Sequence, residues 1–125
     1  MKIIIETIPH DQHRYETCGD YWQDADGTRH IRVSDMGDDR LATLVALHEL
    51  IEWTLCDDRG IAEPDIMAFD KAVPDDSPYA DDPGHDPAAP YHKEHVFAEC
   101  VERLVAAELG VNWQDYEKRV EALFE

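Results

Sequence analysis

The chain has 125 residues, a length that suits one domain and leaves little room for a second hydrophobic core. Hydrophobic residues make up 43% of it, as in a globular protein, and 29 Asp and Glu against 11 Lys and Arg give a formal net charge of −18. Such a charge favours solubility and repels the phosphates of nucleic acids and anionic membranes. We therefore expect direct binding to neither.

The three cysteines indicate a reducing compartment. Cys18, Cys56 and Cys100 are odd in number and lack CxxC spacing, which favours free thiols. Near the N-terminus, the apolar run at residues 3–5 is too short for a signal peptide or a membrane span. We expect a cytoplasmic protein.

Residues 1–36 are predicted to form mainly β-strands. Residues 2–8 are rich in β-branched side chains and are followed by Pro9, which ends the run. Farther along, the dipeptide Asp26-Gly27 supplies the positive φ angles of a tight hairpin turn. We expect two or three antiparallel strands in a small sheet.

The hydrophobic period then changes to that of helices. Asp38 is a suitable N-cap and Gly60 a suitable terminator for a helix over residues 38–59. Further signals predict helices over 63–73, 91–109 and 113–124, with an acidic, Pro-rich loop over 74–90 that is long enough to be functional or disordered. The expected fold class is α+β, with an antiparallel hairpin or small sheet packed on three to four helices in one domain.

Two polar residues lie within the apolar stripe of the 38–59 helix. At about 100° per residue, Leu41 lies about 20° from His48 and Glu52 about 40° from it. A Glu that faces a core is costly unless it is paired, protonated or bound to a metal, and His48 supplies a companion donor one turn away. This pattern favours a metal site. Glu49, turned by about 100°, flanks the pair and would reach a metal-bound water as the catalytic base.

The 91–109 helix is the natural source of the remaining ligands. His92, His95, Glu99 and Glu102 follow spacings of three, four and three, so they share one stripe. Because His95 and Glu99 repeat the i, i+4 relation of the first helix, we predict four metal ligands: His48, Glu52, His95 and Glu99. His92 is the alternate to His95. Four protein ligands would close the coordination sphere, as in structural metal sites.

An alternative for the same helix stays open. Its apolar residues define a core face almost opposite the polar stripe, in which case the polar residues simply face water: Phe97, Cys100, Val101, Leu104 and Val105. The histidines without a helical partner at ligand spacing are expected to be exposed loop or strand residues: His10, His13, His30 and His85.

The segment over residues 40–52, preceded by a hairpin, resembles the active helix of zincin-type metallopeptidases, which carry an HExxH motif. The resemblance covers about residues 28–56. It implies that His48 ligates zinc and that Glu49 is the general base, with Glu52 in place of the second histidine. A carboxylate there also suits manganese or iron. The function implied is metal-dependent hydrolysis of peptides, and the acidic loop over residues 74–90 would favour basic peptides or proteins.

The chain also resembles small uncharacterised proteins of phages and prophages. The shared features are a HELxE helix, here at residues 48–52, and a segment like Asp86-Pro87-Ala88-Ala89-Pro90-Tyr91 before a helix with His and Glu. This likeness implies no activity, but it indicates that the two helices form one unit. For a phage-encoded chain, the expected compartment is the host cytoplasm.

Two other functions are compatible with parts of the sequence. The pairs Glu49/Glu52 and Glu99/Glu102 form E-x-x-E patterns similar to the magnesium-binding helices of all-α nucleotide pyrophosphohydrolases, although the strands and His48 argue against that class. Alternatively, the net charge of −18 suits a non-enzymatic, phage-type inhibitor that mimics DNA. A mimic gives no reason for His48 and Glu52 to face a core.

Overall fold

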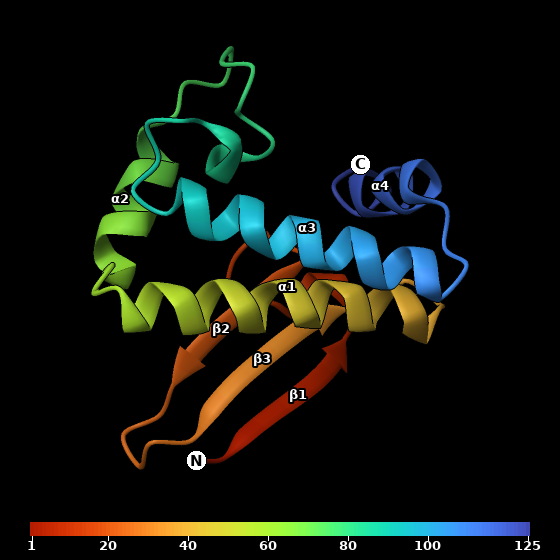
Figure 1. Ribbon diagram of the computed structural model, residues 1–125, viewed down its shortest axis with the longest axis horizontal. Helices are drawn as coiled ribbons and strands as arrows, with labels where there is room; N and C mark the ends of the chain where they lie inside the picture. Colours follow the sequence, from red (N-terminus) through yellow and green to blue (C-terminus); the bar gives the residue numbers. More distant parts are fainter.

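The computed structural model describes residues 1–125 and has an α+β fold, as predicted (Figure 1). A three-stranded sheet is followed by four α-helices, and two short 3₁₀ helices lie in the loops. The strands are β1 (Ile3–Ile8), β2 (Gly19–Gln23) and β3 (Arg29–Ser34), and the helices are α1 (Asp39–Asp58), α2 (Glu63–Ala72), α3 (His92–Glu108), α4 (Trp113–Ala122), η1 (His10–Gln12) and η2 (Pro83–His85). Each α-helix lies over the range that its hydrophobic period predicts.

The sheet is mixed, with strand order β1-β3-β2. β2 and β3 form the predicted antiparallel hairpin, and Gly27 takes a φ of +88° in its turn. The expectation that all strands are antiparallel is wrong for β1, which pairs with β3 in parallel and places Ile5 opposite Ile31. Apolar alternation identifies a strand's buried face but not its neighbour, so the insertion of β3 between β1 and β2 could not be inferred.

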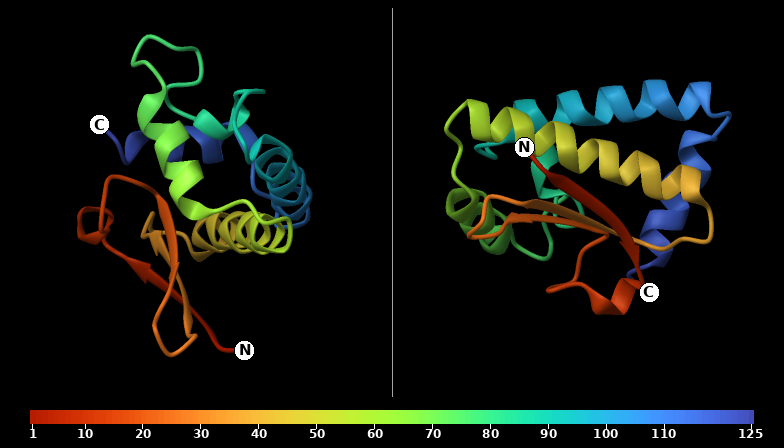
Figure 2. Two further views of the ribbon diagram at one scale, coloured as in Figure 1. Left: turned by 90° about the vertical axis from the view of Figure 1, so that its left-hand side faces the viewer. Right: turned by 90° about the horizontal axis from the view of Figure 1, so that it is seen from below.

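The main core lies between the sheet and α1. Ile31 and Val33 point from β3 toward Leu44 and Val45 of α1, and all four side chains are almost fully buried. Burial of each such side chain stabilises the fold by about 1.5 to 3 kcal/mol. The helices cover one face of the sheet, and α3 runs antiparallel beside α1 (Figure 2). This pairing of α1 and α3 brings the predicted ligand stripes face to face.

The orientation of α3 differs from that of an ordinary amphipathic helix. Phe97 and Leu104 are 54% and 69% exposed, whereas Glu94 and Glu102 are 4% and 7% exposed. The apolar stripe predicted as the core face therefore lies mostly toward solvent, although Val105 packs against the core. The alternative in which the polar stripe faces water is wrong.

Two features explain why the polar stripe of α3 can be buried. Ala98 and Ala106 are fully buried on it, and their small side chains let α3 approach α1 closely. The buried carboxylates also have partners, as Arg59 donates a 2.7 Å hydrogen bond to Glu94. Burial of a paired carboxylate is tolerated, whereas burial of an unpaired one is costly.

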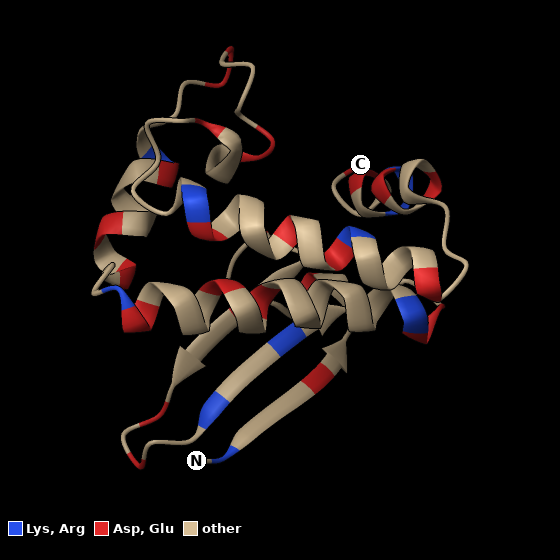
Figure 3. Cartoon of the chain, in the orientation of Figure 1, with Lys and Arg blue, Asp and Glu red and all other residues tan.

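None of the helices combines the length and the apolar character that a membrane-spanning helix needs. Asp and Glu lie along both α1 and α3 and in the loop between α2 and α3, while Lys and Arg are few (Figure 3). The acidic charge thus surrounds the helix pair that carries the candidate site.

Candidate metal centre

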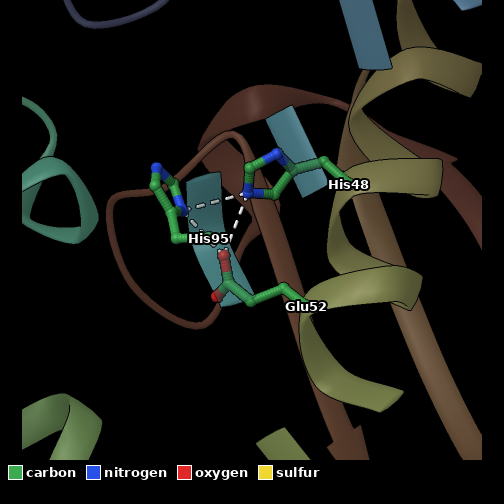
Figure 4. Close-up of side chains that lie close together, drawn as sticks. All are labelled: His48, Glu52 and His95. Atoms are coloured by element: carbon green, nitrogen blue, oxygen red, sulfur yellow. Dashed lines mark hydrogen bonds and ion pairs between the residues drawn. The ribbon is translucent and has the colours of Figure 1, made fainter. Parts of the chain in front are cut away.

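His48 and Glu52 of α1 meet His95 of α3 at the interface of the two helices (Figure 4). Oε2 of Glu52 lies 2.9 Å from Nε2 of His48 and 2.7 Å from Nδ1 of His95, and the two ring nitrogens are 3.1 Å apart. The structure therefore brings together three of the four predicted ligands. Glu52 is 7% exposed, so its carboxylate is largely removed from solvent.

Local helical structure places these side chains. Asp38 caps α1 by accepting a hydrogen bond from the backbone N–H of Arg40, which fixes the start of the helix. His48 and Glu52 are then one turn apart on the side that faces α3. Because α3 is antiparallel to α1, His95 in its first turns meets the second half of α1.

The geometry of the three donor atoms fits a metal ion. Two ligands of a tetrahedral zinc ion, each about 2.0 to 2.1 Å from it, lie about 3.3 Å apart. The three distances here, from 2.7 to 3.1 Å, approach that value. Two imidazoles and one carboxylate are a donor set used by zinc, and the same set is found with non-haem iron. The group could thus bind a divalent metal ion.

Each histidine of the group is also held by a second carboxylate. Nδ1 of His48 donates a 2.8 Å hydrogen bond to Glu102, and Nε2 of His95 forms an ion pair with Oδ1 of Asp82 at 2.9 Å. With a proton on each of these two nitrogens, the other nitrogen of each ring would be free to present its lone pair to a bound ion. Histidine ligands of metals almost always have such partners. This outer layer is the strongest structural indication of a metal centre.

The charges around the centre shift the pKa values of its members. Burial by itself lowers the pKa of His48, but hydrogen bonds to Glu102 and Glu52 outweigh burial and raise it to about 11. Burial likewise lowers the pKa of His95, while Asp82 and Glu52 raise it to about 9. The carboxylates around the two imidazoles outnumber them. A positive charge at the centre, from a protonated histidine or a bound cation, therefore stabilises the cluster.

Glu49, the predicted base, lies beside the three donors without joining them. It points toward β2, where a Cβ added at Gly19 would come within 2.8 Å of its Oε1. Burial raises the pKa of Glu49, the nearby Glu52 raises it further, and His48 lowers it, with a net value of about 8. A carboxylate with a pKa in this range is suited to accept and return a proton near neutral pH.

The fourth predicted ligand, Glu99, lies outside this group. Its Oε2 is 2.9 Å from Nε2 of His85, and Glu102 occupies the position next to His48. Helical geometry explains the difference, because residue 99 is turned by about 40° from His95 and residue 102 by only about 20°. The alternate ligand, His92, donates instead to the carbonyl of Gly84, at 2.9 Å.

Sequence reasoning missed four residues around the centre. Glu102 was on the predicted stripe but was not chosen, whereas Asp82 and His85 lie in a loop, where no period reveals their position. Tyr116 of α4 donates a 2.6 Å hydrogen bond to Glu102, and no sequence pattern indicated that it lies near the centre. His85 was expected to be an exposed loop residue, but it forms a second group with Asp82 and His95.

The other three histidines lie outside the centre and are half-buried rather than exposed. His10 and His13 both contact Oγ of Ser34, at 2.8 and 2.9 Å. His30 pairs with Asp24 at 2.6 Å.

Comparison of the chain with protein-family models, with curated proteins and with solved structures finds no match.

Proposed function

We propose that the protein is a small metal-dependent hydrolase in which His48, Glu52 and His95 hold one divalent ion, preferably zinc. The observation that carries the proposal is the convergence of three protein donors, with both imidazoles fixed by carboxylates. Catalytic zinc sites keep three protein ligands and one open position, whereas structural sites use four. Because Glu99 is bonded to His85, it does not supply a fourth ligand.

A bound divalent ion supplies Lewis acidity for hydrolysis. Glu49 would accept a proton from the attacking water at its carboxylate and pass it to the leaving group. Glu102 and Asp82 keep His48 and His95 in the required tautomers. The partial burial of Glu49 beside β2 supports this role, since it keeps the carboxylate next to the centre without bonding to the ligands.

Peptides with basic side chains are the proposed substrates. A cavity of about 210 Å³ lies beside the second half of α1, and Tyr21, Trp53 and Cys56 line it together with the acidic Asp57 and Glu63. It is smaller than a pocket for a whole ligand but suits one side chain. Arg29 already lies over the Trp53 ring and pairs with Asp57, so the remaining carboxylate, Glu63, is the group that would favour a Lys or Arg side chain.

The proposal is tested with untagged protein that has been stripped by a chelator and reloaded with zinc. We expect hydrolysis of a fluorogenic peptide library to be highest for basic residues. The Glu49→Gln variant should lose at least about 100-fold in kcat yet keep its zinc, because removal of a general base typically costs 10²- to 10⁴-fold. His48→Ala should lose both zinc and activity. His30→Ala, a histidine outside the centre, is the matched control and should keep both.

Three outcomes would contradict the proposal. Equal hydrolysis by metal-free and zinc-loaded protein would exclude a role for the metal. Magnesium-dependent loss of nucleoside triphosphate without peptide cleavage would support the pyrophosphohydrolase alternative. Equal, negligible metal in the wild type and in His48→Ala would remove the basis for an enzyme and favour the DNA mimic.

A further inference from the structure

β1 forms an unpaired edge of the sheet (Figure 1). Its one neighbour is β3, where the backbone N–H of Arg29 donates to the carbonyl of Lys2. Successive residues of a strand direct their backbone groups to opposite sides, so the even-numbered residues of β1 bond to β3. The N–H and C=O groups that point outward therefore belong to Ile3, Ile5 and Thr7. Such an edge is a template for another strand.

β1 has little of what usually protects an edge strand. It contains no Pro and no Gly, five of its six residues are β-branched, and Glu6 is its one charged residue. The side chain of Ile5 is 51% exposed. It lines a groove of about 450 Å³ between β1 and α1, whose other walls include Ala46, Leu47 and Leu50. The edge thus offers both free backbone groups and an apolar surface.

The acidic charge of the chain lies mostly away from this edge. Residues 2–8 and 29–34 hold three positively charged side chains, Lys2, Arg29 and Arg32, against the single carboxylate of Glu6. The other acidic residues lie on the helices and in the loops (Figure 3). Two copies of the chain therefore meet less repulsion at β1 than a net charge of −18 causes elsewhere on the surface.

We propose that two copies of the chain pair through β1 in antiparallel orientation, about a two-fold axis at Ile4, and join their three-stranded sheets into one. The outward backbone groups require odd-numbered residues to face odd-numbered ones, and the charges decide between the registers that remain. With Ile4 opposite its own copy, Ile3 faces Ile5 and Lys2 faces Glu6, twice per dimer by symmetry. Opposite charges that face each other across two strands stabilise the pair. A register with Ile5 at the axis would instead set Glu6 against Ile4.

This pairing also covers the groove beside β1. A two-fold axis perpendicular to the sheet keeps α1 of both copies on the same face, so the two grooves between β1 and α1 face each other across the new strand pair. Ile5 points into its groove and is covered by Ile3 of the second copy. Burial of apolar side chains stabilises the dimer, and the backbone hydrogen bonds fix its register.

Sedimentation velocity over a series of protein concentrations tests the pairing. The wild type should shift from 14.3 kDa to twice that mass as its concentration rises. Lys2→Glu and Glu6→Lys should each weaken the dimer at least about 10-fold, because each sets like charges opposite each other at both symmetric positions. The double variant Lys2→Glu/Glu6→Lys restores opposite charges and should return to the dissociation constant of the wild type.

Net charge alone predicts a different result for these variants. Lys2→Glu makes the chain more acidic and Glu6→Lys makes it less acidic, so a general charge effect would move the two dissociation constants in opposite directions. Glu108→Lys makes the same charge change as Glu6→Lys at an exposed position at the end of α3. This control should dimerise at least as tightly as the wild type. Far-UV circular dichroism of dilute samples checks that every variant is folded.

Amide hydrogen exchange followed by NMR identifies the surface that pairs. In concentrated wild type the outward amides of Ile3 and Ile5 should be protected, whereas in dilute protein they should exchange faster than the amides of β1 that bond to β3. A monomer at every concentration would overturn the proposal, as would a dimer that neither charge variant weakens. A dimer that is lost in Leu104→Lys and kept in Glu6→Lys would also overturn it, because the contact would then lie on the exposed apolar stripe of α3.

Discussion

Tyr116 of α4 is joined to His48 of α1 through the carboxylate of Glu102. Tyr116 donates a 2.6 Å hydrogen bond to Oε2 of Glu102, and His48 donates one of 2.8 Å to Oε1. The C-terminal helix therefore sets the orientation of a carboxylate that in turn orients a predicted ligand. The chain of contacts spans three helices and predicts that α4 affects metal binding.

The first prediction concerns the Tyr116→Phe variant. Loss of the hydroxyl frees the Glu102 carboxylate to rotate, so the ring of His48 loses its fixed orientation. Removal of such an outer partner typically weakens metal binding about 10- to 100-fold. We expect the dissociation constant for Zn²⁺ to rise by about 10-fold in competition titrations with a chromogenic chelator.

Tyr91→Phe is the matched control for that variant. Tyr91 makes the same kind of bond, donating at 2.7 Å to Asp70, but neither residue is hydrogen-bonded to His48. Both variants should lose about 1 to 3 kcal/mol of unfolding free energy, since each leaves one carboxylate oxygen without its tyrosine donor. Equal zinc affinity in the two variants would show that Tyr116 has no special link to the centre.

The second prediction concerns Gly19→Ala on β2. An added Cβ would lie 2.8 to 3.0 Å from Oε1, Cγ and Cδ of Glu49, so the Glu49 side chain must move. We expect zinc affinity to stay within about 3-fold of the wild type, because no ligand is touched, while kcat falls at least about 10-fold as the base is displaced. Parallel measurement of zinc binding and peptide hydrolysis separates the two effects. Unchanged kcat would argue against Glu49 as the base.

Helix α1 and its two polar site residues could be predicted from the sequence, because the apolar residues recur at helical spacing and the polar ones lie within the same stripe. His48 and Glu52 lie within an apolar stripe, and that local pattern survives into the structure, where both face α3. The contribution of His95 followed from the same i, i+4 reasoning. Helical spacing thus predicts which residues share a face of the helix, but not which of two neighbours on that face makes a given contact.

Other parts of the centre depend on contacts that no local pattern contains. Asp82 and His85 come from a loop, and Tyr116 comes from a helix that packs against α3 at its far end. Glu99 and Glu102 are only about 60° apart around the helix, and the exact rotation of α3 against α1, which decides which of them meets His48, is not encoded in the local pattern. The parallel pairing of β1 likewise depends on strand order, which alternation does not encode.

The third prediction concerns α3, whose polar stripe is buried while most of its apolar stripe faces solvent. Leu104 is 69% exposed, so Leu104→Lys should change the unfolding free energy by no more than about 0.5 kcal/mol, as at ordinary surface positions. Ala98 is fully buried against α1, and Ala98→Leu should cost about 1 to 3 kcal/mol because it overfills the interface. Urea unfolding of the two variants measures both values. A large loss in Leu104→Lys would mean that the apolar stripe is buried after all.

The last prediction concerns the coupling of metal binding to stability. An ion that binds the folded chain and not the unfolded chain raises the unfolding free energy by about 2.7 kcal/mol when its free concentration is 100 times its dissociation constant. We expect a gain of this size for the wild type in urea unfolding with Zn²⁺ buffered at that concentration. Glu52→Gln should show little gain, because an amide leaves one fewer anionic donor between the two histidines. Glu6→Gln, on β1 and away from the centre, should gain as much as the wild type. A gain that is the same in all three proteins would place the stabilising ion elsewhere in the chain.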